Sequence, residues 1–372
     1  MSFRRLSLSA VAGLALLATS ACKDQGPGFL SDPAAMSAEL AAVDSSFSAA
    51  AFQSFTQVAP LITPTAGGAL ARAAIVVEGS TPELVKEPAY LSGAIRANAW
   101  RQLVPEVASL SSGPIIPDPV LGQTFEWDTL SNAYAATSRT GAPTNGVRFI
   151  LYAVNSITGQ PTEPVVEVGF VDLMDESSGN TLRLHVQVKG AGGTPTYLDY
   201  TATIVSNNSA TFTATVNGSL SNGAPGLELK TLTFNLSFQV TATAVTSSSS
   251  FDLNNPSVGV DVYERLTLTQ SGIRVTVDFR FTRPGELVRI TGTVTLAASQ
   301  NIFTVTGDLI VTVNGGIFAR LHTDGQTEQW TKHDGTALTA DEQEALVNLF
   351  NAMERFFDLV TNLLEPVDDL IS

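Results

Sequence analysis

Cysteine is almost absent from this 372-residue sequence, which contains only Cys22. A single cysteine excludes an internal disulfide and any zinc site built from several cysteines. Positive charge is also scarce, because 20 lysine and arginine residues stand against 35 aspartate and glutamate residues. Such an acidic chain repels nucleic-acid phosphates, so nucleic acid is not expected among its partners.

Short catalytic and nucleotide-binding motifs are missing as well. The sequence has no G-x-S-x-G, no H-E-x-x-H and no phosphate-binding glycine loop, and we therefore expect no cofactor and no enzyme activity. One group of residues remains a weak candidate for chemistry, because imidazoles and carboxylates close in sequence can bind a metal or act as a base and its orienting partner. Its members are His322, Asp324, His333 and Asp334. The alternative interpretation is a polar turn before the last helix.

No apolar run in the sequence is long enough for a membrane-spanning helix. The longest begins after Arg4 and Arg5 and covers residues 6–18, a length typical of the core of a signal peptide. Small residues then lead to Cys22 in Thr19-Ser20-Ala21-Cys22. This segment resembles the lipobox of bacterial lipoproteins, although Thr19 stands where leucine is usual. The resemblance covers only the first twenty-odd residues.

The lipobox resemblance implies a signal peptide at residues 1–21, removed before a lipidated Cys22, and a short tether over residues 22–31. Removal of the signal takes away Arg4 and Arg5 but no acidic residue, which raises the excess of negative charge from 15 to 17. Lys23 follows the cysteine, and no aspartate is present there of the kind that retains lipoproteins at the inner membrane. We therefore expect an exported protein held in the bacterial envelope by lipid, at the outer membrane rather than the inner.

Alternation of apolar and polar residues dominates residues 122–338. Val275, Val277 and Phe279 alternate with Thr276 and Asp278, for example, and this period of two is typical of antiparallel strands with one buried face. Short turns such as Asn314-Gly315-Gly316 separate the strands, which predicts a long meander of about a dozen strands. Thr241–Ser250 is predicted to be an exposed loop or frayed strand ends, and Asp172 and Asp175 are predicted to be solvated.

Helical patterns flank the strand region. A helical or mixed region is expected over residues 32–121, beginning with Asp32 as N-cap and Pro33 at the first helical position. Residues 339–372 are predicted to form an amphipathic helix that starts at a capping box, in which Glu342 reaches back to Thr339. The apolar stripe of that helix needs a cover, and the sheet is the available one.

The fold predicted from these patterns is mainly β with flanking α: a long, curved antiparallel meander, half-barrel-like, that wraps the C-terminal helix with the N-terminal helix alongside. In outline it looks like the half-open barrels of bacterial lipid and lipoprotein carriers. This analogy suggests an envelope lipoprotein that binds a lipid or other hydrophobic ligand between sheet and helix without catalysis. Two alternatives are a structural or adhesive surface lipoprotein with a closed core and an envelope hydrolase that uses the histidine–aspartate group. The candidate lining consists of Phe234, Phe238, Phe279, Phe350, Phe356 and Phe357.

Overall fold

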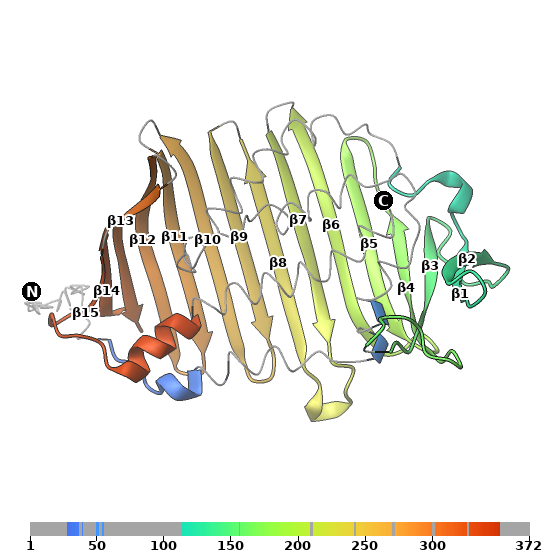
Figure 1. The fold of residues 1–372 in the computed structure, drawn as a ribbon, viewed down its shortest axis with the longest axis horizontal. Coiled ribbons are helices and arrows are strands. Elements are labelled where there is room, and N and C mark those ends of the chain that lie inside the picture. The colour runs from blue at the N-terminus through green and yellow to red at the C-terminus, as the bar shows by residue number, and fades with distance from the viewer. Residues whose placement is uncertain are drawn as a thin grey trace, which may run out of the picture.

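One open sheet of fifteen strands forms the described part of the protein (Figure 1). The computed structural model describes residues 28–36, 39, 50–51, 54–55, 114–155, 157–208, 211–241, 243–269, 272–299, 302–325 and 327–349. Strands β3 to β15 follow one another across the sheet in chain order, and every neighbouring pair among them is antiparallel. The predicted meander is therefore confirmed for most of the sheet.

The strands lengthen from the first members of the sheet toward the middle and shorten again at the end. The bounds are β1 Thr124–Asp128, β2 Ala133–Thr137, β3 Gly146–Tyr152, β4 Glu167–Asp175, β5 Thr181–Gly190, β6 Thr196–Asn208, β7 Thr211–Ser221, β8 Thr231–Val240, β9 Ala244–Leu253, β10 Val258–Thr269, β11 Gly272–Arg283, β12 Glu286–Ser299, β13 Ile302–Val313, β14 Gly316–Asp324 and β15 Glu328–Lys332. Two 3₁₀ turns, η3 (Asp118–Val120) and η4 (Gly226–Glu228), lie outside the sheet.

The first hairpin departs from the predicted pattern. β1 pairs antiparallel with β2 and parallel with β3, so that β2 forms an edge and the sheet is mixed. The prediction of a purely antiparallel meander was wrong here, because the long connection over residues 138–145 lets the chain return to the far side of β1. A two-residue hairpin turn would have forced neighbouring strands to pair.

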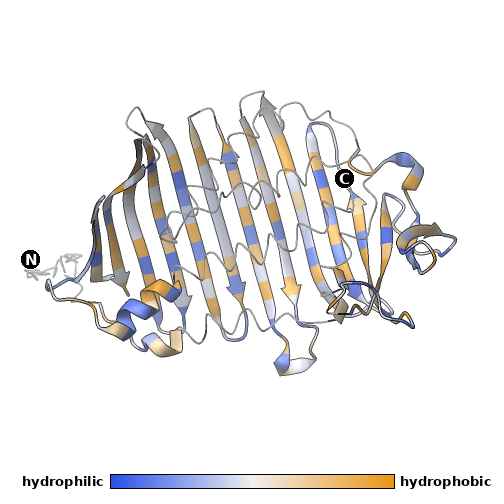
Figure 2. Cartoon of the chain, viewed as in Figure 1, coloured by the Kyte–Doolittle hydropathy of each residue, from blue (hydrophilic) through white to orange (hydrophobic). Residues whose placement is uncertain are grey.

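Apolar and polar residues alternate along most strands (Figure 2), which separates an apolar face from a polar one, whereas β3 and β4 have buried residues on both faces. On β11, Val275, Val277 and Phe279 are buried, while Thr276 and Arg280 are exposed. Most buried apolar residues of β3 to β14 form one core cluster that runs across the sheet, while Ile150, Tyr152 and Phe170 form a second, smaller cluster on β3 and β4. Each Å² of apolar surface that is buried stabilises the protein by about 25 cal/mol, so this face is the main stabilising feature of the fold.

β9 corrects the prediction of an exposed loop or frayed strand ends at Thr241–Ser250. Residues 244–253 form a full strand, with Ser247 and Ser249 buried on the apolar face between β8 and β10. Serine has no strong strand preference of its own, so packing between two β-rich neighbours decides the conformation here.

Helical residues at both ends of the chain join the same core. Asp32 caps the first helical turn by accepting a hydrogen bond from the N–H of Ala35 at 2.8 Å. The capping box is confirmed, since the Thr339 N–H donates to Glu342 Oε2 at 2.7 Å and the Glu342 N–H donates to Thr339 Oγ1 at 3.3 Å. The helix that follows is described over residues 340–349. The buried helical residues in the core cluster are Met36, Ala51, Phe55, Ala345, Leu346 and Leu349.

In the part of the chain that the structure describes, none of the helices combines the length and the apolar character that crossing a bilayer requires.

Candidate functional site on the polar face of the sheet

The phenylalanines predicted to line a ligand site lie in the core where they are described. Phe234 and Phe279 are almost fully buried, and Phe238 is partly buried against the same cluster. Each therefore packs against its neighbours as an ordinary core residue does. Phe350, Phe356 and Phe357 lie outside the described residues, as does Cys22.

The histidine–aspartate group is not brought together. His322 Nδ1 contacts Asp308 Oδ1 on the neighbouring strand at 2.7 Å, while Asp324 accepts hydrogen bonds from Thr327. The His333 N–H bonds to the Phe318 carbonyl, four residues back along β14 from His322, and Asp334 binds Thr336 within its own turn. Within the described ranges, no three histidine, cysteine or acidic residues are placed to hold a metal ion. The polar-turn interpretation fits this arrangement.

Two rows of polar side chains cross the middle of the sheet instead. What we term the asparagine row consists of in-register neighbours on β7 to β11: Asn217, Asn235, Ser250, Asp261 and Arg280. The parallel tyrosine row, two residues away along each strand, consists of Thr215, Ser237, Ser248, Tyr263 and Asp278. Strand pairing fixes both rows, because side chains on one face stand opposite one another about 5 Å apart.

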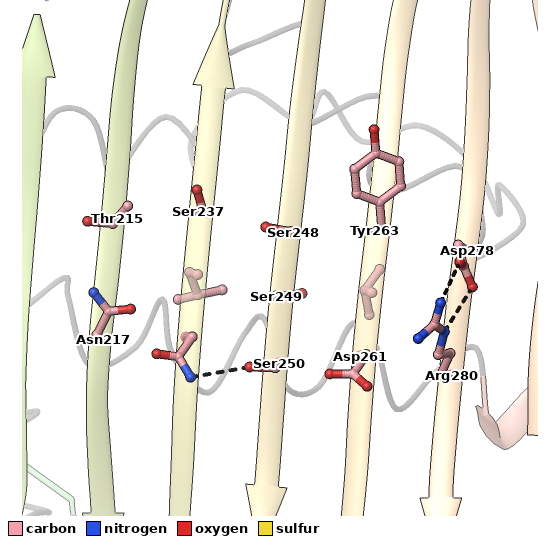
Figure 3. Close-up of a pocket in the computed structure, with 13 residues that line it drawn as sticks. Thr215, Asn217, Ser237, Ser248, Ser249, Ser250, Asp261, Tyr263, Asp278 and Arg280 are labelled. Atoms are coloured by element: carbon pink, nitrogen blue, oxygen red, sulfur yellow. Dashed lines mark hydrogen bonds and ion pairs between the residues drawn. The ribbon is translucent and has the colours of Figure 1, made fainter. Parts of the chain in front are cut away.

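These two rows line a shallow, open hollow of about 480 Å³ (Figure 3). The side chains of the two rows carry hydroxyl, carboxamide, carboxylate or guanidinium groups, and Tyr263 supplies the aromatic ring. Tyr263 is 39% exposed and stands in register with Asp278 on the neighbouring strand (Figure 3). Among the large exposed hydrophobic side chains of the described residues, it is the one in the middle of the polar face.

Paired charges make the hollow nearly neutral. Arg289 donates to both oxygens of Asp278 at 2.8 and 2.7 Å, and Arg280 approaches the same carboxylate at 3.1 Å. The hydrogen bonds from Arg289 lower the pKa of Asp278 below its usual value. Partial burial and the nearby charge of Asp252 raise the pKa of Asp261. The guanidinium groups of Arg280 and Arg289 thus balance the carboxylates of Asp261 and Asp278, and Asp252 adds a further negative charge nearby.

A second hollow of about 760 Å³ adjoins the first along β10 to β14 and shares Tyr263 and Asp278 with it. It brings Arg289, Arg320 and Asp308 to the same face. The polar face therefore offers a continuous shallow depression across the strands rather than a closed pocket.

Two further carboxylates were predicted to be solvated, but each instead accepts hydrogen bonds from other groups of the protein. Asp172 is buried and accepts hydrogen bonds from Arg148 Nε and Nη2 at 2.6 and 2.8 Å, while the same guanidinium lies 3.8 Å from the Phe170 ring centre. Asp175 accepts a 2.6 Å hydrogen bond from the N–H of Ile115 and so fixes the chain that enters β1. Both carboxylates have structural roles at the β3–β4 side of the sheet.

Sequence reasoning missed the two rows although their signal was present. Each strand's polar residues could be read from alternation, but the rows appear only when neighbouring strands are placed in register. Because no strand was predicted at β9, Ser248 and Ser250 were missing from the middle of the two rows.

Comparisons with protein-family models, curated proteins and solved structures found no match to this chain.

Proposed function

We propose that the protein is an exported lipoprotein, anchored through Cys22 in the outer membrane, that binds a neutral glycan on the polar face of its sheet without catalysis. The observation that carries the binding proposal is the hollow over β7 to β11, in which two rows of short polar side chains flank the exposed ring of Tyr263. The anchoring rests on the lipobox resemblance at Cys22.

The chemistry of the hollow suits a polymer of uncharged sugars. Hydroxyl and carboxamide groups both donate and accept hydrogen bonds, as sugar hydroxyls require, and an aromatic ring can stack on the apolar face of a sugar. Balanced charges give no preference for an anion or a cation. The rows repeat with the strand spacing of about 4.8 Å, so an extended chain lying across the strands meets a further polar side chain at each strand.

Binding is expected to depend on Tyr263. In a glycan microarray followed by titration calorimetry with hexameric β-1,4-linked hexoses, Tyr263→Ala should weaken binding about fivefold, because the loss of an aromatic contact costs on the order of 1 kcal/mol. Gln239→Ala, an exposed change on β8 outside the hollow, serves as the matched control and should bind as the unaltered protein does. Equal affinity of both variants, or no neutral glycan bound on the array, would refute the proposal.

Lipidation is expected to depend on Cys22 alone. In bacteria fed an alkyne-labelled fatty acid, the full chain should incorporate label and fractionate with outer membrane, whereas Cys22→Ala should lose both properties. Acyl chains bind at about 0.8 kcal/mol per buried CH₂, so their loss removes the membrane affinity of an acidic protein. Lys23→Ala is the neighbouring control and should keep the label. Persistent labelling of Cys22→Ala would contradict the assignment.

A hydrophobic ligand between sheet and helix stays a prediction. Its support is that Leu346 and Leu349 of the helix share one core cluster with the apolar face, as a curved sheet around the C-terminal helix requires. The same packing equally suits the alternative of a structural or adhesive lipoprotein with a closed core. The hydrolase alternative lacks the convergence of His322 and His333 that it needs.

A further inference from the structure

Exposed apolar side chains in the described structure gather at one end of the strands. This end, which we call the anchor end, consists of the connections at residues 129–132, 153–166, 191–195, 222–230, 254–257, 284–285 and 314–315; the η4 turn marks it at the lower edge of Figure 1. Leu130, Ile157 and Leu227 in these connections are 93%, 92% and 96% exposed. Val165, Val166 and Leu229 add to them. The opposite connections contribute none of the large exposed hydrophobic residues among those described.

Charge is sparse where these apolar residues lie. The seven connections contain only Glu163, Glu228 and Lys230 as charged residues and are otherwise rich in glycine, proline, asparagine and small side chains. An exposed leucine on an ordinary surface needs no explanation, but several on adjacent turns with few charges between them are typical of a surface that meets an apolar environment.

The chain that leads from the lipid anchor arrives at the same end. The Gly28 N–H donates to the Ile317 carbonyl at 3.1 Å, just beyond the β13–β14 turn, and a Cβ on Gly28 would lie 2.5 Å from the Gly316 oxygen. The Ser31 N–H bonds to Glu286 Oε2 at 2.7 Å beside the β11–β12 turn. The entry point of the chain is thus fixed by close backbone contact. Phe29, 69% exposed, lies at this entry.

The length of the tether decides which end can meet the membrane. Five residues lie between Cys22 and Gly28, and the six steps from one to the other cover roughly 20 Å in a fully extended chain, at about 3.5 Å per residue. β12 has 14 residues and at about 3.3 Å per residue is roughly 45 Å long. A lipid on Cys22 can therefore reach the bilayer when the anchor end faces it, and not when the opposite end does.

From these two independent observations we infer that the anchor end lies on the bilayer and inserts the apolar side chains of its turns into the lipid interface. This inference rests on the proposed lipidation of Cys22. The strands then stand away from the membrane, and the polar face projects sideways, open to a ligand. A zwitterionic surface suits this contact, because the excess of 17 negative charges on the mature chain is repelled by anionic lipid.

Site-specific quenching tests the inference on the lipidated full-length protein. Because lipidation consumes the one native cysteine, Leu227→Cys and Thr243→Cys each create a single thiol for an environment-sensitive fluorophore. These positions flank β8 at its two ends, and both are exposed. In phosphatidylcholine vesicles that contain brominated lipid, the probe at position 227 should be quenched several-fold more strongly than the probe at position 243.

Flotation of the same vesicles separates the two hypotheses. Protein that fails to float refutes the lipid anchor. Protein that floats but shows equal quenching at positions 227 and 243, or none at 227, refutes the membrane contact while the anchor stands. A second test needs no fluorophore. The lipidated double variant, Leu227→Ser with Leu229→Ser, should float as well as the unaltered protein. Added protease should, however, cleave its turn at residues 222–230 faster. Unchanged cleavage would contradict the insertion.

Discussion

Arg283→Ala is expected to lower the free energy of unfolding by about 3–5 kcal/mol, because it leaves the carboxylate of Glu286 buried without its partner. The side chains of both residues are less than a tenth exposed, and Arg283 Nη2 lies 2.8 Å from Glu286 Oε1. The same guanidinium donates to Ser31 Oγ and the Asp32 carbonyl, both at 3.1 Å. The substitution thus also releases the segment that leads to the anchor. Urea denaturation followed by circular dichroism measures the effect.

Two further variants show whether the burial of this pair causes the effect. Arg280→Ala removes an exposed pair with Asp278 and should cost less than about 1 kcal/mol. Combining Arg283→Met with Glu286→Leu removes both charges at once and should recover much of the loss, because no buried charge is left unpaired. If Arg283→Ala proves no more harmful than Arg280→Ala, the buried pair does not hold the N-terminal segment to the sheet.

The parts of the fold that depend on local sequence could be predicted. Asn314 and Gly315 both adopt positive φ, at 49° and 84°, which is the geometry of the type I′ turns that asparagine–glycine pairs favour in hairpins. The capping box at Thr339 and Glu342 likewise depends on residues three apart in the chain. In each case, the interacting groups are neighbours in sequence, so the residue types alone specify the structure.

The parts of the fold that depend on tertiary neighbours could not be predicted from the sequence. Ser247 and Ser249 lie in a strand because β8 and β10 enclose them on both sides. Asp172 is buried and pairs with Arg148, whose guanidinium also lies over the Phe170 ring, although the alternation along the strands predicted three ordinary strand residues. The parallel pairing of β1 with β3 follows from the path of a connection whose residues specify no turn type.

The candidate site belongs to this second group. Tyr263, Asp278 and Ser248 come from three strands and form one row only through strand register. His322 and His333 were predicted as a candidate group because they lie close together in the chain. The pairing of β14 with β15 separates these two, because His322 stands opposite Gln329 while His333 bonds to Phe318, four residues away along β14.

Phe279→Ala is expected to destabilise the protein by about 3–5 kcal/mol, the usual cost of a cavity left by a large core side chain. Phe279 is fully buried on β11 and stands in register between Val262 and Ile290. Thr282→Ala, on the exposed face of the same strand, is the matched control and should change the unfolding free energy by no more than about 0.5 kcal/mol. Denaturation of lipid-extracted protein gives both values.

Native mass spectrometry of the same variants separates core packing from a ligand site. If Phe279 packs the core, the unaltered protein carries no lipid at this position, and Phe279→Ala shows only the loss of stability. If Phe279 lines a hydrophobic site, the unaltered protein releases lipid on extraction, Phe279→Ala releases less, and the stability of the extracted protein hardly changes. Core packing and a ligand site therefore give opposite results in the two measurements. Removal of a contact with bound lipid leaves the stability of the lipid-free protein unaffected, whereas removal of a core contact lowers it.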